Sequence, residues 1–468
     1  MQFRGAAKKG PEPRLVYLIY SFLMGSAALL LLPYWLIKGL REGKYLSNVR
    51  ERLGLSTDSL EKLPKDHPGA IWIHAVSVGE LLSSIALAKR LRAAYPNRPL
   101  VVSTTTMTGQ ALARERLHFA DAIFYFPLDW SFCVRRILRI ARPALVLILE
   151  TEIWPNFLRE AHRQGVPVLF VSGRISDRSI ARYQRYLRGF GFFLRPFLRS
   201  ALGNAEAFLM QSEKDAQRIR ALGAPGDRVS VSGNLKYDME LPAPTPLSNW
   251  LEAEARRQGR SPIVVAGSIV ATEEPLALIA FGVVQGEHPK ALLVLAPRKP
   301  ERFEAAADFI HESRRKFIRR SELVLAGHGQ GEPSSNNGSI SSDVTVLLLD
   351  SIGELASLYR LADGALVGGS LVPSGGHNIL EPAAFGKIPV FGPSMENFAD
   401  IAARFVAADA AIQVESPEDA GVAWIELLQN PERRRKMGEN ARYLVDSSRG
   451  ATDRVLAEIA RLLGSPAQ

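Results

Sequence analysis

The chain has very little cysteine, since Cys133 is the only one among 468 residues. A single cysteine excludes an intrachain disulfide framework and suits a reducing compartment. Neither this cysteine nor the eight histidines form a cluster with metal-ligand spacing, and no Asp-x-Asp pair occurs. The sequence therefore argues against a metal site, and we expect neither a metal nor a cofactor.

The chain also lacks any recognised nucleic-acid-binding motif, although it is strongly basic. Its formal net charge is +10 and its isoelectric point is near 9.7. Such a charge favours anionic partners, and without a binding motif we expect a membrane surface or a nucleotide, and no nucleic acid. A length of 468 residues with 47% hydrophobic side chains predicts two globular domains, each with a sizeable core.

Residues 15–37 contain no charged side chain and form an apolar run long enough to span a bilayer. Aromatic residues lie towards both ends of the run, as in a membrane-interface belt. A cleaved signal peptide fits less well, because the run is longer than an h-region and no small-x-small cleavage site ends it. Basic residues on both flanks leave the orientation undecided, and a helix that lies in the interface is an open alternative. We predict that residues 1–45 form a membrane anchor, and that deletion of residues 1–40 leaves the rest folded.

From about Pro68, short apolar runs alternate with amphipathic segments of helical length. Continuous apolar strands between helices are typical of a doubly wound parallel α/β sheet. The proline-rich stretch at 241–249 interrupts this alternation and predicts a linker. We therefore predict an α/β fold in which residues 46–240 and 241–468 form two Rossmann-like domains that face a central cleft, the second ending in a helical tail. The predicted strands are 70–76, 99–105, 122–127, 144–150, 166–172, 207–211, 228–233, 262–268, 291–297, 344–350, 365–369 and 388–392.

The stretch 361–393 contains a short strand, a glycine-rich loop, a helix that opens near Asn378 and a second strand. This order offers unpaired backbone N–H groups and a positive helix end to an anion. Four glycines in the loop let the backbone approach a ligand closely, and Glu381 lies about one turn into the helix, within reach of sugar hydroxyls. We predict a nucleotide or sugar-phosphate site here. The alternative is that the glycines serve tight turns only.

Other polar clusters follow predicted strands, where open α/β sheets bind ligands. The segments 77–80 (SVGE) and 351–354 (SIGE) each fit the capping box S-x-x-E, in which serine and glutamate satisfy helix N–H groups reciprocally. The sequence thus leaves both a capping role and a functional role open for Glu80 and Glu354. Arg298 follows a buried strand among other cations, which fits either a phosphate clamp or an ion pair at a helix start.

Three further candidates lie at strand ends in the first half. Glu150 and Glu152 end a long apolar strand, with no evident basic partner in the sequence. Lys236 follows the predicted strand 228–233, although a surface lysine is the ordinary expectation at such a position. Charged side chains at the carboxyl edge of a parallel sheet favour a functional role for this group.

With these residues in view, the chain resembles the 3-deoxy-D-manno-octulosonic acid (Kdo) transferases over nearly its whole length. The resemblance implies a GT-B glycosyltransferase that moves Kdo from CMP-Kdo to a lipid A precursor in the synthesis of the lipopolysaccharide inner core. It also implies an enzyme tethered by its N-terminus to the cytoplasmic face of the inner membrane. The motifs that carry it are HAVSVGE (74–80), LETEIWPN (149–156), GNLKYD (233–238), APRKPERF (296–303), SIGELASLY (351–359) and GGSLVPSGGHNILEPAAFGKIPVFGP (368–393).

The resemblance implies roles for individual residues as well. Glu80 matches the general base that deprotonates the acceptor hydroxyl, with inversion at the anomeric centre, while Glu150 and Lys236 match residues that stabilise the transition state. The chain departs from the family before Glu273 and Glu274, where Ile269-Val270-Ala271-Thr272 replace the usual Thr-His-Glu-Gly. The CMP-binding segments match Pro297, Arg298, Ile352, Gly353, Glu354, Asn378, Ile379, Leu380 and Glu381.

Two alternatives stay open at this point. One is another GT-B enzyme that uses a UDP-sugar for transfer or for 2-epimerisation, which a comparison of CMP and UDP binding separates. The other is a membrane-anchored assembly scaffold with a degenerate nucleotide fold. The presence of Glu80, Arg298 and Glu381 argues against the scaffold.

Overall fold

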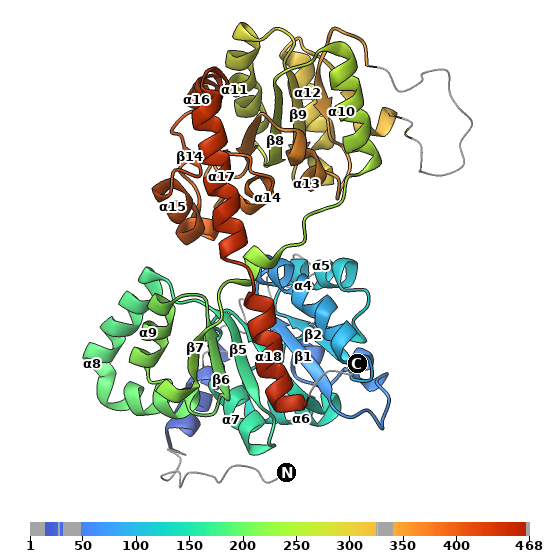
Figure 1. Cartoon of the computed structure of the whole chain (residues 1–468). Coiled ribbons are helices and arrows are strands. Elements are labelled where there is room, and N and C mark those ends of the chain that lie inside the picture. Colours follow the sequence, from blue (N-terminus) through green and yellow to red (C-terminus); the bar gives the residue numbers. More distant parts are fainter. Residues whose placement is uncertain (1–14, 27–28, 31–47, 324, 326–339, 465–468) are drawn as a thin grey trace. The chain divides into compact units, whose positions relative to one another are not determined.

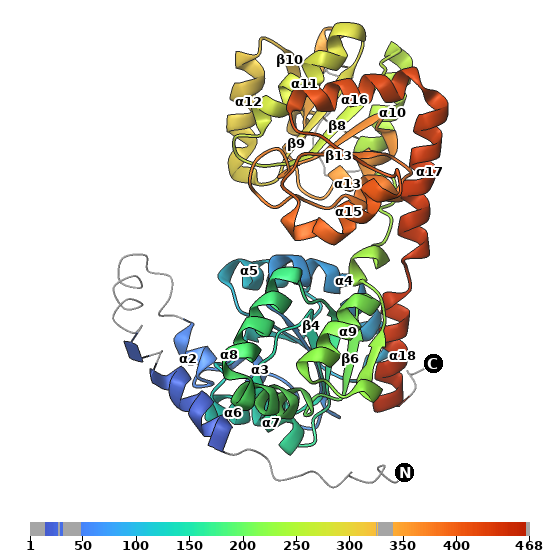
Figure 2. The same cartoon turned by 90° about the vertical axis from the view of Figure 1, so that its left-hand side faces the viewer.

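A computed structural model describes residues 15–26, 29–30, 48–323, 325 and 340–464. The chain forms two compact units, the first made of Met1–Met239 with Arg449–Gln468 and the second of Glu240–Ser448. Each unit has its own parallel sheet covered by helices (Figures 1 and 2). The last helix thus belongs to the first unit, whereas the sequence assigned all of 241–468 to the second domain.

The first unit contains a seven-stranded sheet in the order β3-β2-β1-β4-β5-β6-β7, with every neighbouring pair parallel. The chain runs outward from β1 to β3 and then returns to place β4 on the other side of β1. All seven predicted strands of this half are present, and all but β7 are almost entirely buried, as their apolar composition predicts. They are β1 (Ala70–Ala75), β2 (Leu100–Thr104), β3 (Ala122–Tyr125), β4 (Pro143–Leu149), β5 (Val168–Gly173), β6 (Ala207–Met210) and β7 (Val229–Val231).

Helices cover both faces of this sheet. Alternate residues of β1 point to opposite faces, so Trp72 packs in one core while Ile71 and Ile73 pack in the other. The helices are α2 (Val49–Arg52), α3 (Asp58–Glu61), α4 (Val78–Ala94), α5 (Met107–Arg116), α6 (Ser131–Ala141), α7 (Pro155–Arg163), α8 (Asp177–Leu202), α9 (Glu213–Leu222), η1 (Gly226–Arg228), η2 (Leu235–Asp238) and α18 (Ala451–Leu463).

The second unit repeats this plan with the strand order β10-β11-β9-β8-β12-β13-β14, again all parallel. Two edge strands, β10 and β14, were not predicted, because the first is at most half-buried and the second has only two residues. The strands are β8 (Ile263–Ile269), β9 (Leu292–Pro297), β10 (Lys316–Arg319), β11 (Val344–Leu348), β12 (Gly364–Val367), β13 (Pro389–Phe391) and β14 (Ile412–Gln413).

Helices also flank the second sheet on both faces, over two apolar cores. The predicted surface loop 327–343 lies mostly outside the described residues. The predicted tail consists of two helices, α17 in this unit and α18 in the first. The helices are α10 (Pro246–Gln258), α11 (Glu274–Glu287), η3 (Pro300–Arg302), α12 (Phe303–Glu312), η4 (Arg320–Glu322), α13 (Leu355–Leu358), η5 (Tyr359–Leu361), α14 (Leu380–Ala384), η6 (Glu396–Phe398), α15 (Ala399–Ala407), α16 (Pro417–Gln429) and α17 (Pro431–Ser447).

Part of the predicted anchor is described, and it packs against the first unit. Residues 15–26 are helical. The Tyr17 ring is 1% exposed and meets Phe197 edge to face, while the Tyr20 hydroxyl donates to Asp129 at 3.0 Å. Within the described ranges, no helix is both long and apolar enough to cross a membrane. The rest of the predicted anchor lies outside those ranges.

Candidate functional site

Both sheets have a point near the middle where the chain switches direction, and ligands of open α/β sheets bind at the carboxyl ends of the strands there. In the first unit this point lies between β1 and β4, and in the second between β8 and β12. Glu80 and Glu150 follow β1 and β4, while the glycine-rich loop follows β12. The strand order therefore puts these candidate residues at the expected edge of each sheet.

Glu80 lies in the first turn of α4, where it takes part in a modified capping arrangement. The Ser77 side chain accepts a hydrogen bond from the Glu80 N–H at 3.2 Å, as predicted. A capping box would have the Glu80 carboxylate accept a hydrogen bond from the Ser77 N–H. Instead, the carboxylate accepts from the N–H of the preceding residue, Val76, at 2.7 Å. Ser77 is extended, with φ −108° and ψ 161°, and its own N–H is not the group that the carboxylate reaches. The cap uses one oxygen of Glu80.

Glu80 is 4% exposed, and burial of this kind disfavours the ionised carboxylate. Burial, and after it the charge of Glu150, raises the pKa of Glu80 to about 7. Burial and Glu150 likewise raise the pKa of Glu152. Because a general base works best with a pKa near the operating pH, Glu80 is tuned for proton transfer at neutral pH. In the part of the chain that the structure describes, no three acidic, histidine or cysteine side chains are grouped to hold a metal ion.

His74, six residues before Glu80, is not a competing base. Its ring is fully buried, stacks on Phe126 with centroids 3.8 Å apart, and places Nδ1 2.9 Å from the Ser103 hydroxyl. Burial lowers the pKa of His74 to about 3. The imidazole is therefore neutral at physiological pH and too weak a base to take a proton from a sugar hydroxyl.

Glu150 has a strained backbone at the end of β4. Its φ is +53°, in the left-handed region that non-glycine residues rarely adopt, and its N–H donates to the Val171 carbonyl at 2.9 Å. Such strain concentrates at functional sites, where surrounding structure holds it in place. Lys236 is half-buried in η2. This short helix packs against α4, whose first turn contains Glu80.

Asn156 of the LETEIWPN segment has a structural role that the sequence did not reveal. The buried Asp129 carboxylate accepts from the N–H groups of Asn156 and Phe157, at 3.0 and 2.7 Å. It caps the start of α7 from a separate loop, and burial raises the pKa of Asp129 to about 7. Asp129 lies in an ordinary loop sequence, with no local pattern to predict this contact.

In the second unit, Arg298 lies at the end of β9 beside the residues of the glycine-rich stretch. Burial, and after it the positive charge of Arg298, lowers the pKa of His377 to about 4. Burial raises the pKa of Glu381, against the effects of Asn378 and Arg298. The Asn378 side-chain amide donates to Glu381 at 3.3 Å. The structure therefore brings Arg298, Asn378 and Glu381 together, as predicted, and adds His377.

The four glycines of the loop make room for protein atoms, contrary to our preferred interpretation. A Cβ on Gly368 would lie 2.4 Å from the Ser268 carbonyl oxygen, and one on Gly376 would lie 2.3 Å from a methionine sulfur. Gly369 and Gly375 have positive φ and also face protein side chains. Turns and close packing therefore explain the glycines at all four positions, while the nucleotide or sugar-phosphate site at this loop stays a prediction.

The helix after this loop starts slightly later in the sequence than predicted. It is α14, which has five residues and begins at Leu380, with the Asn378 side chain accepting from the Leu380 N–H at 3.1 Å. Glu381 is thus the second residue of the helix and not one turn inside it. Five residues give a small dipole, so attraction of an anion depends mainly on Arg298. The Ile379 and Leu380 side chains are fully buried and face the core.

Glu354 does not form the capping box that the segment 351–354 fits by its sequence. Its carboxylate accepts from Arg320 at 2.9 Å and from the Ser351 hydroxyl at 2.6 Å. Because Arg320 engages the carboxylate, the segment 351–354 is fixed by an ion pair with η4. Ile352 is 50% exposed and Gly353 has φ +96° at the tip of this turn, whereas Pro297 is buried at the end of β9.

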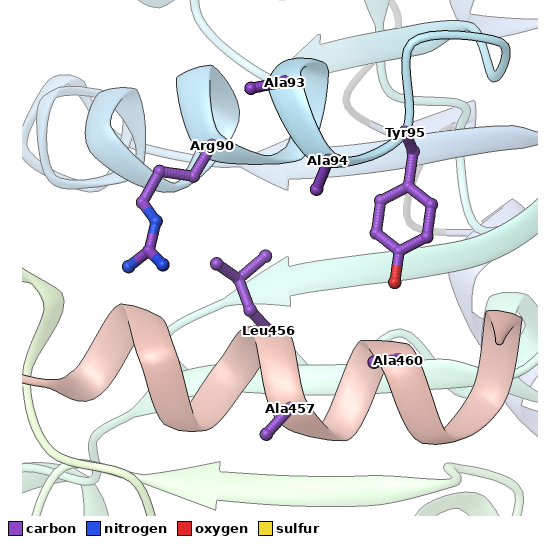
Figure 3. Close-up of a pocket in the computed structure, with 7 residues that line it drawn as sticks. All are labelled: Arg90, Ala93, Ala94, Tyr95, Leu456, Ala457 and Ala460. Atoms are coloured by element: carbon purple, nitrogen blue, oxygen red, sulfur yellow. The ribbon is translucent and has the colours of Figure 1, made fainter. Parts of the chain in front are cut away.

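A hollow of about 500 Å³ on the first unit lies apart from these residues (Figure 3). It lies between α18 and the last turns of α4, at the opposite end of α4 from Glu80, and its walls are largely alanine and leucine. Its two polar groups are engaged elsewhere, since Arg90 pairs with Asp453 and the Tyr95 hydroxyl donates to the Gly464 carbonyl at 3.2 Å. The hollow offers no chemistry and is not the site.

Comparison with known proteins agrees with this arrangement. Residues 47–239 match the family model described as 3-Deoxy-D-manno-octulosonic-acid transferase (kdotransferase). The chain is 34% identical over 415 residues to 3-deoxy-D-manno-octulosonic acid transferase of Bordetella pertussis, covering 86% of this chain and 90% of that protein. It is 33% identical over 397 residues to the Haemophilus influenzae protein of the same name, covering 83% and 86%.

Among solved structures, the chain is similar to UDP-GlcNAc 2-epimerase from Neisseria meningitidis, with a TM-score of 0.52 over 84% of this chain and all of that one. The identity is 15%, so this likeness concerns the GT-B-like fold alone. The relatives from Bordetella and Haemophilus match both units at much higher identity. On this evidence the chain is a glycosyltransferase that belongs to the 3-deoxy-D-manno-octulosonic acid transferase family, which acts in lipopolysaccharide synthesis.

Proposed function

We propose that this protein transfers Kdo from CMP-Kdo to a lipid A precursor, with inversion at the anomeric carbon and with Glu80 as the general base. The observation that carries the proposal is the buried Glu80 carboxyl at a topological switch point, with its pKa raised to about 7. In the reaction, Glu80 takes the proton of an acceptor hydroxyl as its oxygen bonds to the anomeric carbon of Kdo. The bond from that carbon to the phosphate oxygen breaks, and CMP leaves with the electron pair.

Glu150 supports this base by raising its pKa through like charge. Its carboxylate and the Lys236 ammonium are proposed to stabilise the charges that develop as the glycosidic bond to CMP breaks. The strained backbone at Glu150 supports a functional role, since glycine would adopt φ +53° at lower cost.

The donor is proposed to bind the second unit, with Arg298 at the phosphate and Glu381 at the ribose. Arg298 and Glu381 lie close enough for the charge of one to shift the pKa of the other. A guanidinium beside a phosphate makes charge-assisted hydrogen bonds, which suit a leaving group that departs as an anion. The segments around Pro297, Ile352–Glu354 and Asn378–Leu380 complete the proposed CMP site.

The N-terminal helix is proposed to hold the enzyme at the cytoplasmic face of the inner membrane. One face of residues 15–26 packs on the first unit through Tyr17 and Tyr20. Its other face is apolar and 46–73% exposed, and the exposed side chains follow the spacing of a single helical stripe. They are Leu15, Leu18, Ile19, Phe22 and Leu23. Such a stripe suits insertion into lipid, where the acceptor resides.

Incubation of the purified full chain with CMP-Kdo and a tetra-acylated lipid A precursor tests the function, with products read by mass spectrometry. The proposal predicts a lipid heavier by one or more Kdo residues together with released CMP. A parallel incubation with a UDP-sugar tests the alternative of a UDP-dependent transferase or epimerase. Release of UDP or epimerised sugar there, with no Kdo-lipid in the first reaction, would overturn the proposal.

A further inference from the structure

Glu273 is a fully buried acid just before α11, and its carboxylate binds backbone amides of the glycine-rich loop. One carboxylate oxygen accepts the N–H of Gly369 at 2.6 Å and that of Val270 at 3.2 Å. The other accepts the N–H groups of Ser370 and Leu371, both at 3.0 Å. Three successive amides of the loop thus converge on a single side chain from another strand end.

Hydrogen bonds connect the segment held by Glu273 to the second half of the loop. The Gly369 carbonyl accepts the Gly376 N–H at 2.8 Å, which ties the start of the loop to the turn that precedes His377. The His377 ring lies against Gly369, about 3.0 Å from where a Cβ would be. Ser370 adds a second attachment, because its hydroxyl accepts the Gly392 N–H at 2.9 Å. The position of residues 376–378 therefore depends on the segment that Glu273 holds.

We infer that Glu273 is a positioning residue of the donor site, which fixes the loop so that His377, Asn378 and Glu381 face Arg298. The inference rests on the proposed assignment of CMP to this unit. This contact also decides which loop groups are available to the donor. The amides of Gly369–Leu371 point at a carboxylate of the protein itself, so the donor phosphate is left to Arg298 and to the second half of the loop.

A carboxylate is required because both of its oxygens accept hydrogen bonds, two each. Glutamine has the same shape but offers one oxygen and one NH₂ group. Its NH₂ group would face two backbone N–H donors, which leaves buried donors without acceptors and repels the loop. Aspartate keeps the carboxylate with both oxygens, but its side chain is one methylene shorter, so the oxygens lie farther from the loop amides.

The test compares Glu273→Gln with Glu254→Gln as a matched control. Glu254 is 7% exposed in the same unit and accepts the Ile340 N–H at 2.9 Å, away from the glycine loop. CMP affinity is measured by calorimetry, hydrogen–deuterium exchange by mass spectrometry on peptides covering 368–379, and KM and kcat with CMP-Kdo in the transfer assay. Wild-type binding of CMP is measured first, because its absence would overturn the donor assignment itself and not only the role of Glu273.

Glu273→Gln should weaken CMP binding about 10-fold or more and raise KM for CMP-Kdo to match, with kcat within about 3-fold of wild type. Exchange in 368–379 should speed up, and the control should leave affinity and loop exchange unchanged. Should Glu273→Gln not fold, Glu273→Asp should weaken CMP by about 3-fold or more. Wild-type CMP affinity in either folded Glu273 variant, or a fall in kcat with KM unchanged, would overturn the inference.

Discussion

Replacing Glu80 with glutamine should stabilise the protein at alkaline pH while removing its activity. Burial and the charge of Glu150 raise the pKa of Glu80 from 4.5 to about 7 in the folded chain. A carboxyl with a raised pKa contributes stability that is fully present below its unfolded pKa and is lost as the pH rises through its folded pKa. Ionised Glu80 therefore costs the fold about 3 kcal/mol at about pH 8, at about 1.4 kcal/mol for each pKa unit.

Glutamine avoids this cost, because it cannot ionise and its oxygen still accepts the Val76 N–H. The variant should match wild type in free energy of unfolding near about pH 4 and exceed it by about 1–3 kcal/mol near about pH 8. Urea unfolding of both proteins across this range measures the difference, and subtracting the curves cancels every other titrating group. A difference that stays flat over the range, or that favours wild type at the alkaline end, would refute the reasoning.

Three further substitutions test other parts of the account. Arg298→Ala should weaken CMP binding by about 1.5–3 kcal/mol in calorimetry, the worth of a hydrogen bond to a charged group. The same change at the adjacent Lys299, which is exposed as Arg298 is, should have little effect. Glu150→Gly should slow transfer yet raise the free energy of unfolding by about 1 kcal/mol, since glycine adopts the positive φ without strain; a destabilised variant would contradict this. Tyr17→Ala should lower that free energy by about 3 kcal/mol in urea unfolding, because the ring is 1% exposed. Deletion of residues 1–40 removes the Tyr17 and Tyr20 contacts, so the truncated chain should stay folded, as the sequence predicts, but its first unit should be digested faster by protease. An unchanged digestion rate would show that the helix contributes nothing.

The sequence predicted most of the fold because its strands are buried on both faces and carry continuous apolar runs. Eleven of the described strands follow this pattern, while β7 was predicted although Ser230 and Val231 are exposed. The two that escaped, Lys316–Arg319 and Ile412–Gln413, lie at sheet edges, where little burial is needed and no apolar run marks them. The place of α18 in the first unit was equally hidden, since a basic amphipathic helix carries no signal of which sheet it covers.

The candidate site was predictable in its residue types and less so in its contacts. Arg298, Asn378 and Glu381 were expected together, because the resemblance assigns all three to CMP binding and the carboxyl ends of parallel strands lie at one edge of the sheet. The partners of buried acids were not predictable: Glu273 lies almost one hundred residues from the loop that it holds, and no local pattern links them. The role of the glycines was not predictable for a related reason. A glycine reads the same in a sequence whether it makes room for a ligand or for another part of the protein.

The measurement that tests the central claim most directly is the pH dependence of Kdo transfer from CMP-Kdo to the lipid A precursor, in single turnover, for wild type and Glu80→Gln. Wild-type transfer should rise with pH as one group ionises with an apparent pKa near 7, the value that burial and Glu150 give to Glu80. The variant should bind CMP normally, stay folded, and transfer about 100-fold more slowly or worse. Near-normal transfer by a well-folded Glu80→Gln protein would contradict the account and leave Glu80 as a helix cap.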